Sequence, residues 1–332
     1  MIISKTPLRV SLFGGGTDYP VWYRENGGAV LASTIDKYCY ITCRYLPPFF
    51  PHKHRIVYSN VETVNDVSEI QHPAIRAIIQ YFGETKGLEI HYDADLPAKT
   101  GMGSSSSFTV GFLNALKALR GELVDKNTLA KLAIYLEHNV MKENVGVQDQ
   151  ILAAHGNFNK IEFNTDDSFN ITPVILSPER LSELQNYFML YFTGVTRIAS
   201  DVAANQIRNI DKVANHYKKI HELVDEGLTI MEKPKASLAE LGKLLHESWL
   251  LKRELSDNIT NPQIDAIYKS GLDAGAIGGK ILGAGGGGFI LFFADPKTQP
   301  KIREKFKHLI EVPFNFESDG SQIVLDKPNG FI

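Results

Sequence analysis

The segment LPAKTGMGSSSSF at residues 96–108 places two glycines and four consecutive serines between a proline and an apolar run. Apolar residues then recur at helical spacing from Phe108 to Leu119, and Gly121 ends the run, which predicts that the loop opens a helix. A helix N-terminus leaves backbone N–H groups unpaired and carries partial positive charge, so it attracts phosphate. The pattern therefore favours a phosphate-binding loop, with a ligand-free N-cap on a core helix as the alternative.

The small residues of this Ser-rich loop suit a triphosphate. Glycines let the backbone approach phosphate groups, and serine hydroxyls donate to phosphate oxygens or take a coordination position on Mg²⁺. Mg²⁺ usually accompanies substrate phosphates with one or two protein ligands. The residues predicted to bind the triphosphate are Gly101, Gly103, Ser104, Ser105, Ser106 and Ser107.

Two further glycine-rich turns lie at residues 14–16 and 283–288. The second contains a literal G-x-G-x-x-G, but the FILFFADP that follows predicts a strand, whereas a dinucleotide fingerprint requires a helix there. A Walker A motif also fails, because Lys280 is followed by Ile281 instead of Ser or Thr. Three such turns beside apolar segments favour close backbone approach to a ligand, and the last is expected to pack beneath the site.

Composition limits the classes of partner. The chain has 332 residues, 43% of them hydrophobic and 22% charged, with a formal charge of −3. This length allows two cored domains, and the charge gives no footprint for nucleic acid or a membrane, so a small-molecule partner and a cytoplasmic location are expected. Cys39 and Cys43 are interpreted as reduced core thiols, because neither a histidine nor a third cysteine lies near them to complete a metal site.

Strand and helix patterns are mixed without strict alternation, which predicts an α+β fold. Strands are expected at 2–13, 28–46 and 87–97, and a buried strand that runs into a turn is expected within 186–197. Helices are expected near 199–231, 236–255, 262–274 and 297–310. A helix over 126–144 is expected to begin at an Asn127 N-cap and to stop before Gly146. The likeliest domain boundary lies near residues 175–185.

Three motifs in order, PLRVSLFGGGTDYP at 7–20, LPAKTGMGSSSSF at 96–108 and KILGAGGGGFILFF at 280–293, resemble the GHMP kinases. The resemblance covers nearly the whole chain. It implies ATP and Mg²⁺ as cofactors and two domains. Residues 1–180 would resemble ribosomal protein S5 domain 2, and residues 181–332 would be ferredoxin-like, with the active site between them. A homodimer is also compatible with it.

The resemblance also implies the catalytic residues. Asp149 occupies the position of the family's catalytic aspartate, where a carboxylate orients the acceptor hydroxyl and accepts its proton. Arg9 occupies the position of a basic residue that stabilises this carboxylate and the charge on the reacting oxygens. Glu137 is the implied Mg²⁺ ligand, with the hydroxyl of Ser105 or its neighbour Ser104. A turn aspartate, an exposed strand arginine and a solvated glutamate are the structural alternatives.

The implied substrate contacts are Gly15, Gly16, Thr17 and Asp18, with Arg197 as the candidate for a sugar phosphate and Lys99 and Lys280 as weaker ones. Gly15 and Gly16 replace the Glu-His of galactokinases, which opens room for a larger sugar. Together with TGVTR and GSQIV, this is most similar to family members that phosphorylate the anomeric hydroxyl of D-glycero-D-manno-heptose 7-phosphate for surface polysaccharide synthesis. Another sugar 1-kinase, or a catalytically silent sugar and nucleotide sensor, remains the alternative.

Overall fold

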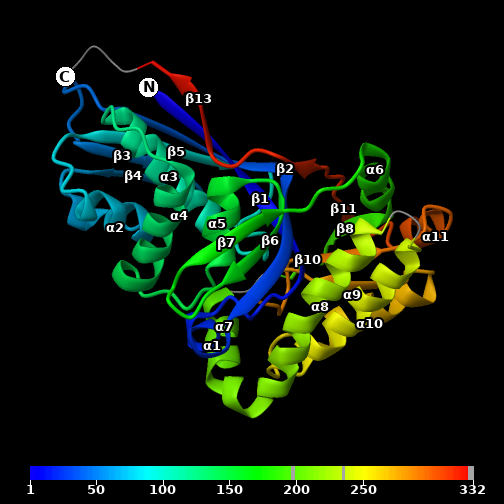
Figure 1. The fold of residues 1–332 in the computed structure, drawn as a ribbon. Coiled ribbons are helices and arrows are strands. Elements are labelled where there is room, and N and C mark those ends of the chain that lie inside the picture. The colour runs from blue at the N-terminus through cyan, green and yellow to red at the C-terminus, as the bar shows by residue number, and fades with distance from the viewer. Residues whose placement is uncertain (196–198, 234–235, 328–332) are drawn as a thin grey trace.

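The computed structural model describes residues 1–195, 199–233 and 236–327, which form two sheets with helices packed against them (Figure 1). The larger sheet has the order β13-β1-β2-β5-β3-β4, and β12 and β6 also pair with β2. Its strands are β1 (Ile2–Phe13), β2 (Gly28–Tyr45), β3 (His54–Val57), β4 (Val61–Val64), β5 (Leu88–Ala94), β6 (Phe158–Phe163), β7 (Phe169–Pro173), β12 (Phe316–Glu317) and β13 (Gln322–Asp326). β3 and β5 are parallel, whereas β1 and β2 are antiparallel.

The long strand β2 serves two partners in succession. Its residues 28–33 pair with β6, and its residues 39–45 pair with β5. β1 runs along the middle of β2, with Arg9 opposite Thr34. The centre of β1 therefore lies beside the part of β2 where the pairing with β6 ends and the pairing with β5 has not yet begun. Backbone pairing with β2 fixes the position of Arg9 there.

Helices cover one face of the larger sheet and enclose its core. They are α2 (Pro73–Tyr81), α3 (Ser104–Leu119), α4 (Lys126–Tyr135) and α5 (Gln148–His155), with the short helices α1 (Pro20–Asn26), η1 (Val67–Glu69) and η2 (Leu136–Val140). α3 packs on both β1 and β2, and Phe112 and Leu116 lie fully buried in this core. The Ser-rich loop does open a helix, as predicted.

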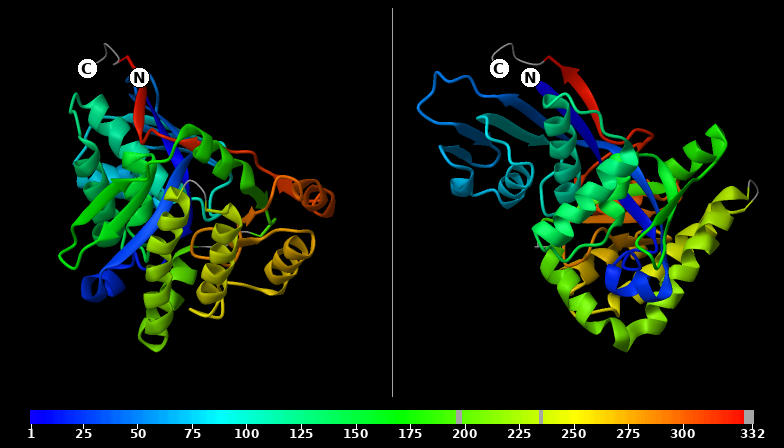
Figure 2. Two further views of the ribbon diagram at one scale, coloured as in Figure 1. Left: turned by 45° about the vertical axis from the view of Figure 1, so that its right-hand side comes forward. Right: turned by 60° about the vertical axis from the view of Figure 1, so that its left-hand side comes forward.

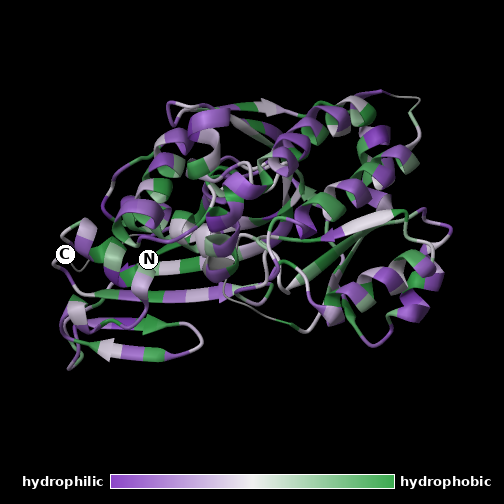
Figure 3. Ribbon diagram, turned by 90° about the horizontal axis from the view of Figure 1, so that it is seen from below, coloured by the Kyte–Doolittle hydropathy of each residue, from purple (hydrophilic) through white to green (hydrophobic). Residues whose placement is uncertain are grey.

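The second sheet has the order β11-β8-β10-β9 and is antiparallel. Its strands are β8 (Phe188–Phe192), β9 (Gly278–Ile281), β10 (Phe289–Phe293) and β11 (Ile310–Glu311). The helices of this half are α6 (Pro178–Tyr187), α7 (Ala199–Asn209), η3 (Ile210–Val213), α8 (Ala214–Glu232), α9 (Leu238–Arg253), α10 (Pro262–Asp273) and α11 (Gln299–Lys305). The helices carry both green and purple residues (Figure 3), and all five residues of β10 are hydrophobic and buried.

The chain closes by returning to the first sheet. β12 pairs with β2 and β13 pairs with β1, so the start and end of the described chain lie side by side (Figure 2). The division into residues 1–180 and 181–332 stays a prediction, and these closing strands cross it. Within the described ranges, none of the helices combines the length and apolar character of a membrane span.

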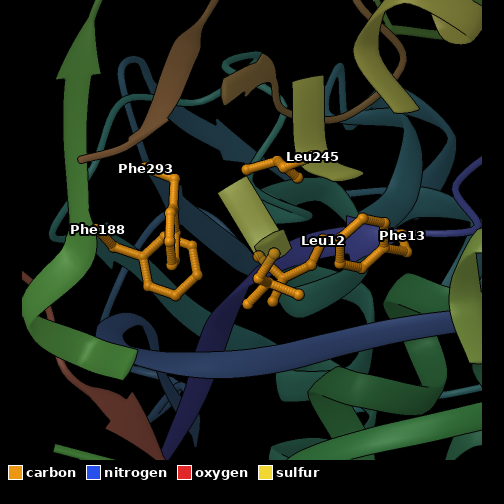
Figure 4. Close-up of a pocket in the computed structure, with 6 residues that line it drawn as sticks. Leu12, Phe13, Phe188, Leu245 and Phe293 are labelled. Carbon is orange, nitrogen blue, oxygen red and sulfur yellow. The ribbon is translucent and has the colours of Figure 1, made fainter. Parts of the chain in front are cut away.

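The two halves share a buried core. Leu8, Val10 and Leu12 on one face of β1 pack with Leu241 and Leu245 of α9 and with Phe293 of β10. The close-up in Figure 4 shows a small apolar gap in this region, lined by Leu12, Phe13, Phe188, Leu241, Leu245 and Phe293, with no room for a water molecule. We interpret this gap as a packing defect, because its lining has no polar group to orient a ligand.

The α+β class and the main strands agree with the sequence, and Cys39 and Cys43 are free and buried on β2. One local prediction is wrong. Asp125, not Asn127, caps α4, because its carboxylate accepts a hydrogen bond from the Thr128 N–H. The segment in which the domain boundary is expected forms α6, whose N-cap Ser177 precedes a proline at the first helical position.

Candidate active site

Arg9 and Asp149 form a bidentate ion pair at the meeting point of β1 and α5. The Arg9 Nε donates to Asp149 Oδ1 and the Nη2 donates to Oδ2, both at 2.7 Å. The remaining terminal nitrogen of Arg9, Nη1, donates to the Gly101 carbonyl at 2.6 Å, and the Arg9 backbone N–H donates to the Met102 carbonyl. This fork fixes both the position and the orientation of the carboxylate.

The ion pair lies beside the N-terminus of α3. Gly103 is the N-cap of this helix, with φ of 76°, and a Cβ at this position would lie 3.3 Å from Asp149 Oδ2. The side chain of Asp149 is 22% exposed, compared with 5% for Arg9. The carboxylate is therefore the accessible member of the pair, beside backbone N–H groups that attract phosphate.

The Ser-rich loop and the 283–288 loop touch at this point. A Cβ on Gly101 would overlap the Leu282 carbonyl, and one on Gly283 would overlap Gly101 itself. Gly288 likewise packs against the backbone of Thr100. The 283–288 loop thus packs beneath the Ser-rich loop, as the sequence predicted, and only glycine permits this approach.

Glu137 is fully buried next to α3. The Ser106 hydroxyl donates to its Oε2 at 3.0 Å, and the Gln150 amide donates to the same oxygen. Its other oxygen, Oε1, has no hydrogen-bond partner among the described residues. Burial, followed by the nearby Glu143 carboxylate, raises the pKa of Glu137 to about 7. A buried carboxylate with an unused oxygen and an adjacent hydroxyl fits a divalent cation.

The serines of the loop separate into different roles. Ser106 faces Glu137, whereas Ser105, the implied metal ligand, is exposed. The Ser107 hydroxyl donates to the Pro7 carbonyl at 2.8 Å and ties α3 to β1. In the part of the chain that the structure describes, no three His, Cys, Asp or Glu side chains gather as a metal cluster. Mg²⁺ held by phosphates and one or two protein ligands does not need such a cluster.

Asp18 lies in the turn after β1. Its Oδ1 accepts from the Gly16 N–H at 2.9 Å, and its Oδ2 accepts from the Gln148 side-chain amide at 3.0 Å. Burial, together with the Asp149 charge, raises the pKa of Asp18. Thr17 has a different role, because its hydroxyl donates to the carbonyls of Gly14 and Ala29 inside the fold. The structure therefore brings Asp18 to the site and uses Thr17 to hold the turn.

Several side chains of the site were not found from the sequence. Gln148 and Gln150 flank Asp149 on α5 and bind Asp18 and Glu137, respectively. Lys252 of α9 is buried, and its Nζ donates to the Gly283 carbonyl. Lys280, a weak candidate from the sequence, is also buried, with its Nζ 2.8 Å from the Leu12 carbonyl. A lysine in an otherwise apolar strand was the available signal for the latter.

The candidate phosphate ligand Arg197 lies outside the described residues. Lys99 is exposed on the Ser-rich loop and adopts a positive φ of 62°. Gly15 and Gly16 are buried beside Asp18, close to Ser11, Gln148 and Tyr217. The site thus unites Arg9, Asp18, Glu137 and Asp149 from four separate segments of the chain.

Two family models match the chain on both sides of this site. The one described as GHMP kinases N terminal domain matches residues 68–157, and the one described as GHMP kinases C terminal matches residues 233–311. The first range contains Glu137 and Asp149, and the second contains Lys252 and Lys280. The chain belongs to the GHMP kinase family and is an ATP-dependent kinase.

Two relatives of known name and one solved structure are similar to this chain over most of its length. The D-glycero-alpha-D-manno-heptose 7-phosphate kinase of Campylobacter jejuni subsp. jejuni serotype O:2 is 29% identical over 89% of this chain and 90% of its own. The bifunctional fucokinase/GDP-fucose pyrophosphorylase of Arabidopsis thaliana is 25% identical over 92% of this chain and 31% of its own. Among solved structures, the D-glycero-D-manno-heptose 1-phosphate kinase of Bacteroides thetaiotaomicron matches 98% of this chain and 100% of its own, with a TM-score of 0.80 and 23% identity. The last similarity supports the fold.

Proposed function

We propose that this kinase transfers the γ-phosphoryl group of ATP to the anomeric hydroxyl of D-glycero-D-manno-heptose 7-phosphate and releases the 1,7-bisphosphate. The observation that carries the proposal is the Arg9–Asp149 fork at the mouth of α3, with Asp18 on one side and the phosphate loop on the other. A positioned carboxylate beside a phosphate-binding helix end is the arrangement that phosphoryl transfer to a hydroxyl requires.

The triphosphate would bind at the N-terminus of α3. Gly103 and the serines that follow it expose backbone N–H groups to the phosphate oxygens. Glu137 and Ser106 would hold Mg²⁺, because Oε1 of Glu137 is buried without a partner among the described residues. The ion would neutralise charge on the phosphate oxygens. Ser105, the ligand implied by the resemblance, is placed on the outer side of the helix.

Asp149 would orient the acceptor hydroxyl and accept its proton as the bond from the sugar oxygen to the γ-phosphorus forms and the bond to the bridging oxygen of ADP breaks. Arg9 binds both carboxylate oxygens, which fixes the position and orientation of Asp149. The Gly101 carbonyl accepts from the other terminal nitrogen of Arg9, which links the proposed base to the phosphate loop. Such preorganisation lowers the barrier without reorganisation during the reaction.

Asp18 and the adjacent glycines would bind the sugar. The heptose is favoured because Gly15 and Gly16 add no side chain of their own beside Asp18. It is also favoured because the similarity to the Campylobacter jejuni D-glycero-alpha-D-manno-heptose 7-phosphate kinase extends over 90% of that protein. Arg197 remains the sequence-based candidate for the 7-phosphate. The product would lead to nucleotide-activated heptose for surface polysaccharide.

A panel of acceptors tests this function. ADP release is measured with the heptose 7-phosphate, the unphosphorylated heptose, fucose and galactose, and the product is analysed by phosphorus NMR. The expected result is turnover of the 7-phosphate to the 1,7-bisphosphate at the highest kcat/KM. Preference for fucose or galactose would assign another sugar 1-kinase. Binding of ATP and sugar without ADP release would contradict the kinase mechanism itself.

A further inference from the structure

Buried cations exceed buried carboxylates where the two halves of the chain meet. Arg9, Lys252 and Lys280 are 5%, 6% and 2% exposed, and the acidic groups that act on them are Asp18 and Asp149. Arg9 is already committed to Asp149. The described residues contain no carboxylate within ion-pair distance of either lysine. A buried ammonium without a counter-ion is costly, so this cluster is incomplete on its own.

Lys252 is connected to Arg9, and so to the Arg9–Asp149 pair, through two glycines that touch each other. Its Nζ donates to the carbonyl of Gly283, which touches Gly101, and the carbonyl of Gly101 binds Arg9. Gly101 and Gly283 thus touch each other, and the carbonyl of each accepts a hydrogen bond from one buried cation. The donor to Gly101 is Arg9, from the first half of the chain, and the donor to Gly283 is Lys252, from the second half. The Lys252 ammonium acts electrostatically on Asp18, Asp149 and Arg9 across this contact. The Nζ of Lys280, the other buried lysine, donates a hydrogen bond to the Leu12 carbonyl.

Unused hydroxyls surround the neighbouring glycines. The Ser11 Oγ is buried, has no hydrogen-bond partner in the described chain, and lies 3.7 Å from the place a Cβ of Gly15 would take. The Tyr217 ring lies 3.2 Å from the corresponding place at Gly16, and its buried hydroxyl is likewise without a partner there. Leu255, three residues after Lys252, also packs at Gly16. The two hydroxyl-bearing side chains and the end of α9 therefore pack around the same two glycines.

We propose that Lys252, Ser11 and Tyr217 form an anion subsite around Gly15 and Gly16 that binds the phosphate already present on the acceptor sugar. A phosphate supplies the missing negative charge and accepts hydrogen bonds from the ammonium and from both hydroxyls. Asp18 borders this subsite, because its Oδ1 accepts from the Gly16 N–H. Glu137 instead binds Ser106 and Gln150, so the acceptor phosphate and the triphosphate are assigned to different residues. This inference rests on the proposed function and makes a phosphorylated acceptor its substrate class.

The subsite also assigns a task to the second half of the chain. Lys252 and Tyr217 come from α9 and α8, whereas Ser11 and the two glycines come from β1 and its turn. The acceptor phosphate would therefore bridge the two halves.

Steady-state kinetics of the 332-residue chain test the subsite with Lys252→Met, which removes the charge and keeps an unbranched side chain. The KM for the heptose 7-phosphate is expected to rise about 10- to 100-fold, as for loss of a charged hydrogen bond. The KM for unphosphorylated heptose and for ATP should change less than about twofold. The matched control is Lys243→Met, on the same helix, where the lysine is exposed and pairs with Glu240. Equal increases for both sugars, or a fall in kcat alone, would overturn the proposal.

Two milder variants guard against a folding defect in Lys252→Met. Ser11→Ala and Tyr217→Phe each remove one hydroxyl from the subsite. Each should raise the KM for the phosphorylated sugar by about 3- to 10-fold, with the KM for the unphosphorylated sugar unchanged. A melting temperature close to that of the original chain establishes that each variant is folded. Loss of activity toward both sugars in these folded variants would count against the subsite.

Binding of inorganic phosphate separates failure of this inference from failure of the proposed function. Calorimetry is performed with a non-hydrolysable ATP analogue and Mg²⁺ present, so that the helix N-terminus is occupied. The original chain should bind phosphate and Lys252→Met should not, whichever sugar the enzyme phosphorylates. Absence of phosphate binding in the original chain, or equal binding by both proteins, refutes the subsite even if the heptose 7-phosphate is the substrate.

Discussion

The carboxylate of Asp18 occupies the space in which a side chain at Gly146 would lie. A Cβ on Gly146 would overlap Oδ2 of Asp18, the oxygen that accepts hydrogen bonds from Gln148. Gly146 precedes α5, which carries Asp149, so the same short segment presents the proposed base and makes room for the sugar-binding carboxylate. The absence of a side chain at Gly146 thus allows the Asp18 carboxylate to lie against the segment that leads to Asp149.

Gly146→Ala should displace Asp18 and weaken acceptor binding. We expect the KM for the sugar to rise about 10-fold or more, as for loss of a charged hydrogen bond, with little change in the KM for ATP. Thermal denaturation of the double variant with Asp18→Ala provides the cross-check, because removing the carboxylate removes the overlap. If Gly146→Ala is equally destabilising in both backgrounds, the overlap with Asp18 is not the cause.

Asp149→Asn tests the proposed base while it preserves the size of the side chain. Without a carboxylate to accept the proton, kcat should fall by about 10²- to 10⁴-fold. Arg9→Lys complements it, because lysine cannot form the two parallel hydrogen bonds of the fork. Single-turnover rates with saturating ATP measure the chemical step for both variants. An Asp149→Asn rate within a few-fold of the original would show that Asp149 positions the hydroxyl without accepting its proton.

The sequence predicted those parts of the site that a local pattern determines. Helical spacing after Phe108 located the start of α3, and motif resemblance located Arg9 and Asp149. α5 was missed because its apolar residues, Ile151 to Ala154, cover only about one turn, too few to establish a period. The position of Asp149 within the first turn of a helix could therefore come only from the structure.

The serine that faces Glu137 could not be chosen from the sequence. Successive residues of a helix differ by about 100° in direction, so a choice among four serines requires the rotational phase of α3. This helix is buried around most of its circumference, and its apolar residues therefore define no single stripe. Lys252 could not be predicted from the sequence for another reason. It lies near Arg9 because two glycine loops touch, and these loops are more than 180 residues apart in the chain.

The Mg²⁺ requirement distinguishes the two serines. Glu137→Gln keeps the hydrogen bond from Ser106 but loses the charge, so the Mg²⁺ concentration for half-maximal activity should rise about 10- to 100-fold. Ser106→Ala should raise it less than Glu137→Gln but more than Ser105→Ala. Activity is titrated with Mg²⁺ at constant free ATP. A larger effect of Ser105→Ala than of Ser106→Ala would support the ligand implied by family resemblance over the one that faces Glu137 in the structure.

The buried ammonium of Lys252 predicts a pH dependence of stability in the absence of ligands. Burial, together with the positive charge of Arg9, lowers the pKa of Lys252 to about 8, from 10.5 in the unfolded chain. Between these values the unfolded state binds the proton more strongly, so the contribution of Lys252 to folding becomes more favourable as pH rises. Lys280 also faces Lys252 and opposes its charge, whereas Asp18 and Asp149 favour it.

Comparison of the original chain with Lys252→Met isolates this contribution. At pH 7.5 the variant should be the more stable protein, because it avoids burying an unpaired charge. The difference in the free energy of unfolding should shrink by an amount on the order of 2 kcal/mol between pH 7.5 and pH 9.5, since one pKa unit corresponds to about 1.4 kcal/mol. Urea denaturation at both pH values measures it, with Lys243→Met as the exposed control. A constant difference would mean that Lys252 keeps an ordinary pKa in the folded protein, and that an anion or solvent already compensates its charge.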